Sequence, residues 1–215
     1  LKTGLLTRGN PTMTTNMNKI IEDMRSGRPI ILVDAHDREN EGDLVVALEK
    51  ATAENISFTM REARGLMCVP CAGSVLDRLE IPPMVATNTD KNETPFTVSV
   101  DARDGTTTGM SVGDRLATMA VLLDETSKPE ELTRPGHLFP LRARDGLLKE
   151  RQGHTEGSVE LALLAGLRPL TMICEIINAD GTMASGEDLK AFAEEHGLSI
   201  VSIDEVYEAA YNTGV

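Results

Sequence analysis

Apolar residues recur at helical spacing in several stretches of the chain, and each stretch predicts an amphipathic helix. The first set occupies positions i, i+3, i+4 and i+7 and consists of Met17, Ile20, Ile21 and Met24. Residues 26–29 then contain Gly and Pro, which end helices. The same reasoning predicts helices over residues 52–63, 74–79, 112–123, 155–166 and 185–196, and a last one from residue 204.

Short apolar or alternating runs lie between these helices and predict β-strands. They occupy residues 30–33, 44–48, 66–69, 96–100, 170–177 and 199–203. The first two are neighbours along the chain and flank a charged loop, whereas the others alternate irregularly with helices. This order favours the α+β class, with a single three-layer α/β/α domain and a mixed β-sheet over residues 16–215. Residues 1–15 are rich in Gly, Thr, Pro and Asn, and we expect a flexible N-terminal arm there.

Composition narrows the classes of function. The chain of 215 residues has a net charge of −13, only 3% aromatic residues and no Trp. The charge disfavours nucleic acid and anionic membranes as partners, and the shortage of aromatic rings argues against a stacking platform for single strands. Since no apolar run could span a bilayer, no signal peptide is visible and the cysteines number three, we expect a cytoplasmic protein without disulfides.

The acidic loop, residues 34–43, is the most unusual segment and lies between two predicted strands. It contains five carboxylates and one arginine, Arg38. Clustered carboxylates repel one another unless a cation binds or a pKa rises, and oxygen-rich clusters suit hard cations such as Mg²⁺. The loop therefore predicts a cation site at one end of the sheet, although a solvated acidic turn would have the same composition.

Residues 151–156, Arg-Gln-Gly-His-Thr-Glu, form a second candidate segment at a loop-to-helix junction. Thr155 can cap the helix, and the backbone N–H groups there, with Arg151, predict a small anion site that suits a phosphate. His154 offers a neutral imidazole to a metal. The competing interpretation is an ordinary capped helix with a surface Arg and His.

Two other motifs are weaker by themselves. Residues 133–137 read Thr-Arg-Pro-Gly-His, and a turn with a solvated His137 is the plain alternative to a catalytic histidine. Cys68 and Cys71 match C-x-x-C, but no second pair completes a zinc site, so they predict buried or pocket-lining thiols. Since no dinucleotide-binding or P-loop motif occurs, a nucleotide cofactor is not indicated.

Taken together, these segments resemble the 3,4-dihydroxy-2-butanone 4-phosphate synthase family of riboflavin biosynthesis. The resemblance extends from about residue 16 to residue 207 and rests on residues 37–44 (DRENEGDL), 106–111 (TTTGMS), 114–115 (DR), 133–143 (TRPGHLFPLRA), 153–156 (GHTE), 174–176 (CEI) and 180–184 (DGTMA). The order and spacing of several motifs together make it specific. Ala35 and His36 stand where the family usually has acids, and no departure of this kind removes a matched catalytic side chain.

The resemblance implies a lyase that converts D-ribulose 5-phosphate to L-3,4-dihydroxy-2-butanone 4-phosphate and formate. It implies that Glu39 and His154 bind Mg²⁺, with Mn²⁺ as the alternative ion, and that no organic cofactor takes part. It implies that His137 and Glu175 are catalytic, and that the enzyme is a homodimer with two sites near the subunit interface. The implied substrate contacts are Arg38, Glu39, Asp43, Arg151, Gln152, Gly153, His154, Thr155 and Glu175.

The residue types agree with that chemistry without proving it. A ketose phosphate needs an anion clamp, and enolisation beside a carbonyl needs a Lewis acid and groups that move protons. A Mg²⁺-dependent phosphohydrolase would use the same acids and clamp, and would release inorganic phosphate. A non-enzymatic sugar-phosphate sensor would use the clamp but would gain nothing from His137 or Glu175.

Overall fold

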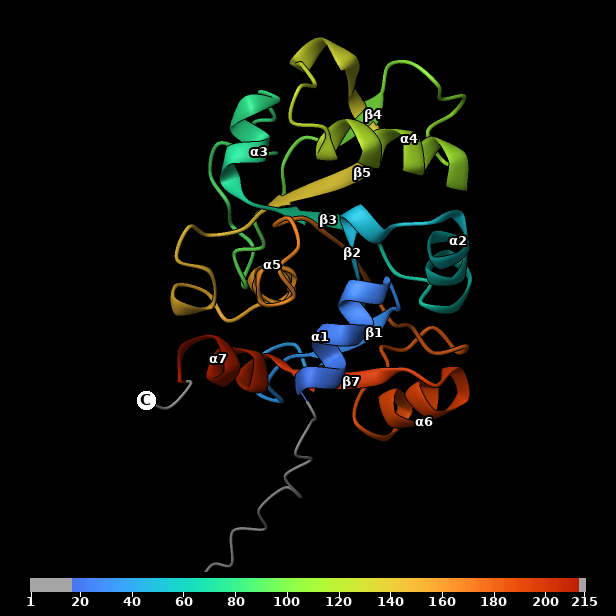
Figure 1. The fold of residues 1–215 in the computed structure, drawn as a ribbon, viewed down its shortest axis with the longest axis vertical. Coiled ribbons are helices and arrows are strands. Elements are labelled where there is room, and N and C mark those ends of the chain that lie inside the picture. The colour runs from blue at the N-terminus through green and yellow to red at the C-terminus, as the bar shows by residue number, and fades with distance from the viewer. Residues whose placement is uncertain (1–16, 213–215) are drawn as a thin grey trace, which may run out of the picture.

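A mixed β-sheet of seven strands organises the chain in a computed structural model that describes residues 17–212 (Figure 1). The predicted arm over residues 1–15 lies outside the described residues. The strand order is β4-β5-β3-β6-β2-β1-β7. The strands are β1 (Ile30–Val33), β2 (Gly42–Ala47), β3 (Cys68–Cys71), β4 (Val100–Ala102), β5 (Leu132–Arg142), β6 (Thr171–Glu175) and β7 (Ser199–Ser202).

Parallel and antiparallel pairs both occur in this sheet, which confirms the predicted mixed topology. β1 and β2 form an antiparallel hairpin around the acidic loop, and β2 pairs antiparallel with β6. β1 pairs parallel with β7, and β3 pairs parallel with β5. The hairpin and β6 thus bring the acidic loop beside the end of a strand that is distant in sequence.

Helices cover both faces of the sheet, so the chain has the predicted α/β/α layers. The helices are α1 (Met17–Ser26), α2 (Ala53–Glu62), α3 (Gly73–Arg78), α4 (Val112–Leu123), α5 (His154–Leu164), α6 (Glu187–His196) and α7 (Ile203–Tyr211). Short 3₁₀ turns lie at Leu48–Lys50, Pro129–Glu131 and Leu147–Lys149. Figure 1 shows α5 and α7 on one side of the strands, with α2 and α6 on the other. Among residues 17–212, no helix is long and apolar enough to cross a membrane.

The alternation of side chains along the central strands divides the core between these two faces. In β1, Ile30 and Leu32 join the core with α1, α5 and α7, whereas Ile31 packs with residues of α6 on the opposite face. Val45 and Val46 of β2 point to opposite faces in the same way. Because both faces are covered, these strands are apolar at successive positions, which explains the continuous apolar runs in the sequence.

The structure corrects several predicted elements at their ends. No strand was predicted between residues 101 and 169, where the structure has the eleven-residue strand β5. The predicted strand over 96–100 reduces to β4, with only isolated bridges at Phe96 and Thr97. The helix predicted from 185 begins at Glu187, after Gly186, whose φ of +50° suits glycine.

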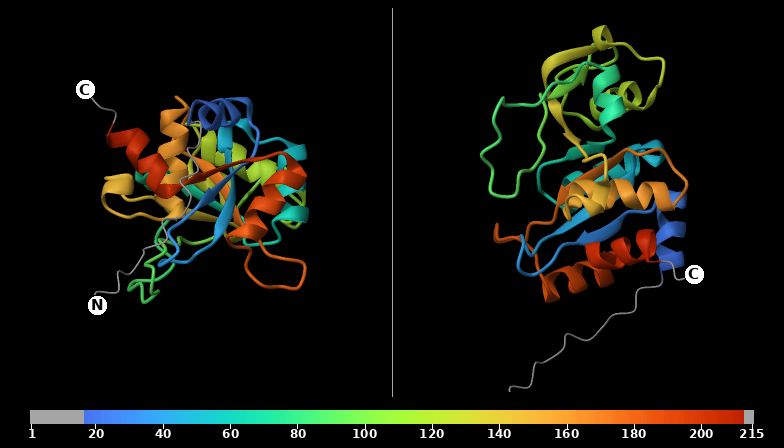
Figure 2. Two further views of the ribbon diagram at one scale, coloured as in Figure 1. Left: turned by 90° about the horizontal axis from the view of Figure 1, so that it is seen from below. Right: turned by 90° about the vertical axis from the view of Figure 1, so that its left-hand side faces the viewer.

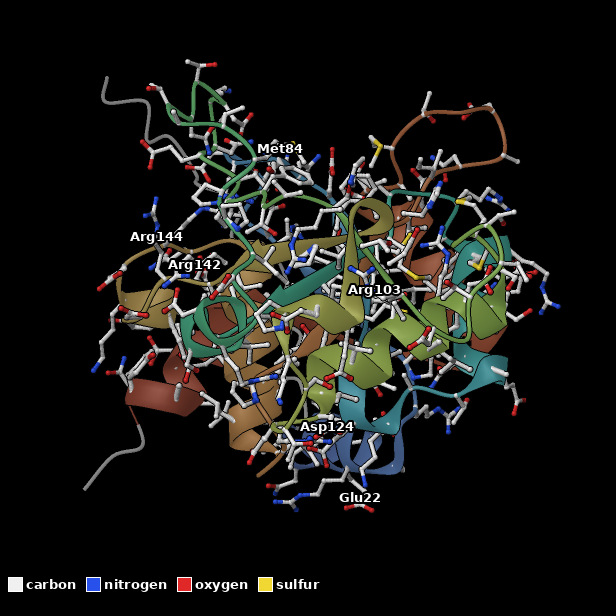
Figure 3. All side chains as sticks on the ribbon, turned by 90° about the horizontal axis from the view of Figure 1, so that it is seen from above. Glu22, Met84, Arg103, Asp124, Arg142 and Arg144 are labelled. Atoms are coloured by element: carbon white, nitrogen blue, oxygen red, sulfur yellow. The ribbon has the colours of Figure 1, made fainter. Side chains whose placement is uncertain are left out.

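Figure 3 shows the molecule from above, with Arg103, Arg142 and Arg144 labelled. Arg142 pairs with Asp77 of α3, and Arg144 pairs with Glu93. The long loop between α3 and β4 extends from the body of the molecule (Figure 2). Its return towards the sheet brings Asn92 into hydrogen-bond contact with Glu39 of the acidic loop.

Candidate active site

Asp34 gives the acidic loop a definite turn. Its Oδ1 accepts a hydrogen bond from the backbone N of Glu41 at 3.0 Å, and its Oδ2 accepts one from the backbone N of Glu39 at 3.0 Å. Arg38 Nη1 donates to Asp34 Oδ2 at 2.9 Å. Asn40 has a φ of +58°, a conformation that Asn tolerates better than most residues. The loop is therefore folded on itself and is more than a solvated run of charge.

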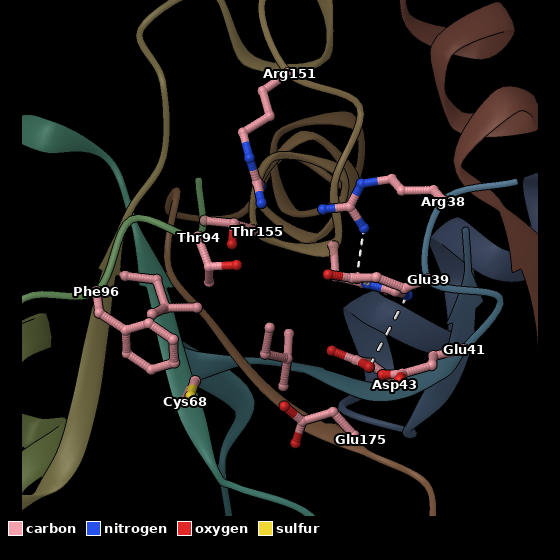
Figure 4. A pocket seen from close by; sticks show the side chains of 13 residues that line it. Arg38, Glu39, Glu41, Asp43, Cys68, Thr94, Phe96, Arg151, Thr155 and Glu175 are labelled. Carbon is pink, nitrogen blue, oxygen red and sulfur yellow. Dashed lines mark hydrogen bonds and ion pairs between the residues drawn. The ribbon is translucent and has the colours of Figure 1, made fainter. Parts of the chain in front are cut away.

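A cavity of about 120 Å³ opens where this loop meets α5 and the end of β6. Figure 4 shows it from close by. Most of the residues predicted to bind substrate lie there together. The lining side chains are Arg38, Glu39, Glu41, Asp43, Cys68, Thr94, Phe96, Leu141, Arg151, His154, Thr155, Ile173 and Glu175.

Charge is unevenly distributed in this cavity. The guanidinium groups of Arg38 and Arg151 lie towards one end, and the carboxylates of Asp43 and Glu175 lie towards the other (Figure 4). Phe96 and Cys68 form part of an apolar wall between them. The cavity thus suits a small molecule with an anionic end and a polar, uncharged end.

The buried acids do not all titrate normally. Burial raises the pKa of Asp43 to about 7, although the charge of His154 opposes the shift. A hydrogen bond with His154 and the charge of Arg38 outweigh burial and lower the pKa of Glu39 to about 2. Burial alone would lower the pKa of His154, but attraction to Asp43 and Glu39 raises it to about 9. The cluster is therefore a strongly coupled set of acids around one buried imidazole.

The donor atoms in this cluster fit a hard divalent cation. Ligand atoms of Asp34, Glu39 and His154 lie within 4.8 Å of one another. Two buried atoms, Asp43 Oδ1 and His154 Nε2, have no hydrogen-bond partner among the described residues and are 3.9 Å apart. Asp34 uses both oxygens to hold the loop, and the oxygens of Glu39 accept hydrogen bonds from Arg38 and Asn92. Asp43 Oδ1 and His154 Nε2 are therefore the donors that need no rearrangement to meet a cation, whereas Glu39 would exchange one of its partners for it. Carboxylate oxygens with one imidazole suit Mg²⁺ or Mn²⁺.

The start of α5 corrects one prediction. The N-cap is Gly153, no side chain caps the helix, and Thr155 is the second helical residue. A Cβ built on Gly153 would lie 2.3 Å from Arg151 Nη1 and 2.9 Å from Arg38 Nη2, so a larger residue there would displace the two guanidinium groups from their present positions. Gln152 is exposed and does not line the cavity. The first-turn N–H groups thus face the cavity without a competing side-chain cap.

Glu175 ends β6 opposite Asp43, with which it is paired in register. Its Oε2 accepts a hydrogen bond from the backbone N of Leu66 at 2.8 Å. A Cβ on Gly65 would lie 2.5 Å from that same oxygen, so glycine lets this loop approach the carboxylate. One oxygen of Glu175 is thereby held by the backbone, while the side chain lines the cavity.

Comparison with known proteins decides the family. A family model described as 3,4-dihydroxy-2-butanone 4-phosphate synthase matches residues 18–209. The chain belongs to that family. The riboflavin biosynthesis protein RibBA of Nocardia farcinica is 49% identical over 197 residues, which cover 91% of this chain and 48% of the relative. RibBA of Mycobacterium tuberculosis strain H37Rv is 47% identical over 199 residues, covering 92% and 47%. The chain thus spans about half the length of the curated relatives it matches.

Solved structures of 3,4-dihydroxy-2-butanone 4-phosphate synthase share this fold. A crystal structure described as a complex with two magnesium ions is 37% identical, with a TM-score of 0.87 over 92% of this chain and 97% of the other. A Candida albicans synthase is 41% identical, with a TM-score of 0.83 over 91% and 97%. The resemblance to the family and the α+β class are both confirmed.

His137, predicted to be catalytic in this synthase-family chain, does not line the cavity. It lies on β5, its side chain is 48% exposed, and its Nδ1 is 2.7 Å from Asp101 Oδ2. The cavity of one chain therefore brings together Glu175 and the charged substrate-binding candidates, but not His137.

Sequence reasoning missed the contribution of the loop after α3. Asn92 Nδ2 donates to Glu39 Oε1 at 2.7 Å, and Arg151 Nε donates to the backbone oxygen of Asn92 at 3.1 Å. Thr94 and Phe96 line the cavity beside them. The length of this polar loop was visible in the sequence, but its return across the site was not. The predicted pocket-lining thiol is confirmed at Cys68.

Proposed function

We propose that this chain converts D-ribulose 5-phosphate to L-3,4-dihydroxy-2-butanone 4-phosphate and formate, with Mg²⁺ as cofactor. Family membership supports the reaction. The observation that carries the proposal is the cavity itself, in which two guanidinium groups lie opposite a cluster of carboxylates and a buried imidazole (Figure 4). Residues 16–215 are then the synthase domain.

The cationic end of the cavity suits the phosphate of the substrate. Arg151 Nη1 is 2.6 Å from Glu156 Oε2, and Glu156 is fully buried, so the guanidinium is held in a fixed orientation. Arg38 lies across Gly153 from it, and the uncapped first turn of α5 adds backbone N–H donors. Fixed donors of this kind bind a phosphate and orient the rest of the molecule.

The acidic end suits the reacting carbons of the sugar. Glu39 and His154 would hold Mg²⁺, with Asp43 as a further oxygen donor, and Mn²⁺ suits the same donors. When bound, the metal would act as a Lewis acid on the carbonyl and hydroxyl oxygens. Glu175 lines the cavity beside Asp43, and we assign it a role in moving protons on and off carbon.

His137 belongs in this scheme if a second copy of the chain supplies it. Its half-exposed side chain lies outside the cavity of its own chain. We therefore propose a homodimer with two sites near the subunit interface, in which His137 of one copy completes the cavity of the other. An interface of this kind in a symmetric dimer would complete both sites at once.

One assay separates the synthase from its two alternatives. The full chain is incubated with ribulose 5-phosphate and Mg²⁺, and both formate and inorganic phosphate are measured. The synthase releases formate, a phosphohydrolase releases phosphate, and a sugar-phosphate sensor releases neither. Glu175→Gln should abolish formate release, whereas Glu187→Gln, which alters an exposed ion pair on α6, should keep it. Phosphate release without formate would overturn the proposed reaction.

A further inference from the structure

Asp101 holds His137 at two points. Asp101 Oδ1 accepts a hydrogen bond from the backbone N of His137 at 2.9 Å, and Asp101 Oδ2 lies 2.7 Å from His137 Nδ1. The Asp101 side chain is only 12% exposed, whereas the His137 side chain is 48% exposed. One buried carboxylate thus fixes both the backbone and the ring of a histidine that stands towards solvent.

The local backbone is built around this contact. The pairing of β4 with β5 shifts in register between Val100, which faces Leu138, and Asp101, which faces Thr133. The intervening residues 134–137 form a bulge that carries His137 out of the ladder. A Cβ on Gly136 would lie 2.0 Å from the carbonyl carbon of Val100, so the bulge fits against β4 only with glycine there.

A second glycine covers the pair from the loop before α4. Gly109 has a φ of +83°, and a Cβ built on it would lie 2.2 Å from Asp101 Oδ2 and 2.5 Å from His137 Nδ1. Asp114 Oδ2 accepts a hydrogen bond from the backbone N of Gly109 at 3.0 Å and so holds this loop in place. The loop thus packs directly over the Asp101–His137 contact and restricts rotation of the ring.

We infer that Asp101 is a positioning residue that sets the tautomer of His137. Because an ionised carboxylate only accepts hydrogen bonds, the proton of a neutral His137 ring lies on Nδ1. Nε2 then carries the free lone pair, and among residues 17–212 it makes no hydrogen bond. A histidine arranged in this way can take a proton from a substrate at Nε2 and return it. This inference rests on the catalytic role proposed for His137.

The test exchanges the carboxylate for an amide of the same shape. In Asp101→Asn, the amide NH₂ facing Nδ1 would favour a ring with its proton on Nε2. The full chain, labelled with ¹⁵N-histidine, is examined by NMR, and the signal of His137 among the four histidines is identified with His137→Asn. We expect the parent to show the Nδ1–H tautomer and Asp101→Asn to show the Nε2–H tautomer. We expect kcat to fall by ~10²–10⁴-fold with KM largely unchanged.

Two matched variants separate positioning from folding. Asp101→Glu keeps the charge and should retain the Nδ1–H tautomer and regain part of the lost kcat. Asp23→Asn removes a buried carboxylate of α1 that accepts hydrogen bonds from Lys19 and Ser199 and does not contact His137, and should lower thermal stability without changing the tautomer. The inference is wrong if Asp101→Asn keeps the Nδ1–H tautomer or turns over at the parent rate. Since the NMR result does not depend on the reaction, absence of formate from the parent would count against the proposed function alone.

Discussion

The charged groups of the cavity and those around His137 differ in burial and pairing. In the cavity, the charges are buried and neutralise one another: Arg151 pairs with Glu156, Arg38 pairs with Asp34 and Glu39, and His154 lies among three acids. Around His137, the carboxylate of Asp101 is buried, and the histidine that it contacts is half exposed. The cavity is thus preorganised for binding, whereas His137 is oriented but meets no ligand-binding residue of its own chain.

This contrast implies that substitutions in the two regions affect binding, stability and catalysis differently. A change in the cavity leaves a buried charge without its partner, so binding, stability and catalysis all respond. A change at His137 removes a group that contributes little to packing, so catalysis responds and the fold does not. The following experiments test that difference, beginning with the largest expected effect.

Glu39→Gln should abolish turnover. The change removes the anionic metal ligand but preserves the shape of the side chain, and loss of Lewis-acid catalysis corresponds to at least ~10³-fold in kcat. Formate release at saturating substrate and increasing Mg²⁺ measures the effect. Thermal stability in the absence of metal should also fall at neutral pH, because the hydrogen bond with His154 and the charge of Arg38 lower the pKa of Glu39 and so stabilise its charged form in the folded protein. Parental activity at limiting Mg²⁺ would refute the ligand role.

Mixed dimers test whether His137 acts on the partner's cavity. Glu39→Gln and His137→Asn chains are each inactive, but a shared dimer would contain one site with both residues intact. Random mixing at equal amounts gives half mixed dimers with one of two sites restored, or about a quarter of the parent activity. If His137 acted within its own chain, mixing would restore nothing.

Arg151→Ala should weaken catalysis and the fold together. Loss of a charged hydrogen bond to the phosphate costs about 1.5–3 kcal/mol, which lowers kcat/KM by ~10–150-fold. Glu156 would be left buried without its cation, so the free energy of unfolding should fall by about 3 kcal/mol. Kinetics and urea denaturation measure the two effects. Arg144→Ala, which removes an exposed pair with Glu93, is the control and should change neither by much.

Mg²⁺ affinity should rise with pH in the range where His154 loses its proton. The pKa of His154 is raised to about 9, so at pH 7.5 most rings carry a proton that the metal must displace. Asp43, with a pKa of about 7, is already mostly ionised at pH 7.5, so only His154 changes its charge between pH 7.5 and 9. The affinity should therefore increase ~tenfold per pH unit in that interval and then level off. Titration calorimetry measures this, and His154→Asn should lose the slope. A flat profile in the parent would contradict ligation by His154.

The smallest effect is expected at Asn92. Its Nδ2 occupies Glu39 Oε1, an oxygen that the metal also needs. Asn92→Ala should therefore tighten Mg²⁺ binding by ~2–10-fold, in line with the net free energy of one hydrogen bond. Asn88→Ala removes a hydrogen bond within the same loop and should leave the affinity unchanged. Weaker binding in Asn92→Ala would show that Asn92 supports the metal site instead of competing with it.

Local patterns predicted the helices, the neighbouring strands β1 and β2, and two of the segments that line the cavity. The hairpin is short-range, so the acids of its loop necessarily share one end of the sheet, and Arg151 to Thr155 lie at one helix start. Glu175 was predicted only from the family resemblance. The helix cap was wrong because the sequence offered Thr155, whereas in the structure Gly153 is the N-cap and lies between two arginines.

The pairing of strands and side chains that are far apart in the chain could not be predicted from the sequence. β5 was missed because the Pro and Gly of residues 135–136 break the apolar alternation, yet the strand continues through a bulge. The placement of His137 away from Glu175 depends on the strand order, which periodicity does not encode. Asp101 and Asn92 were not predicted for the same reason, since each contacts a residue that is distant in sequence, His137 and Glu39 respectively.

The burial of α5 determines which parts of the site can unfold locally. Residues His154 to Ala162 are all buried, and the helix packs against α1, α7 and the sheet. Its amides should therefore exchange with deuterium only when the whole domain unfolds, whereas those of residues 84–94 should exchange through local opening. Helix α5 is thus one of the last parts of the protein to unfold, and the cavity residues that it carries should stay in place until global unfolding.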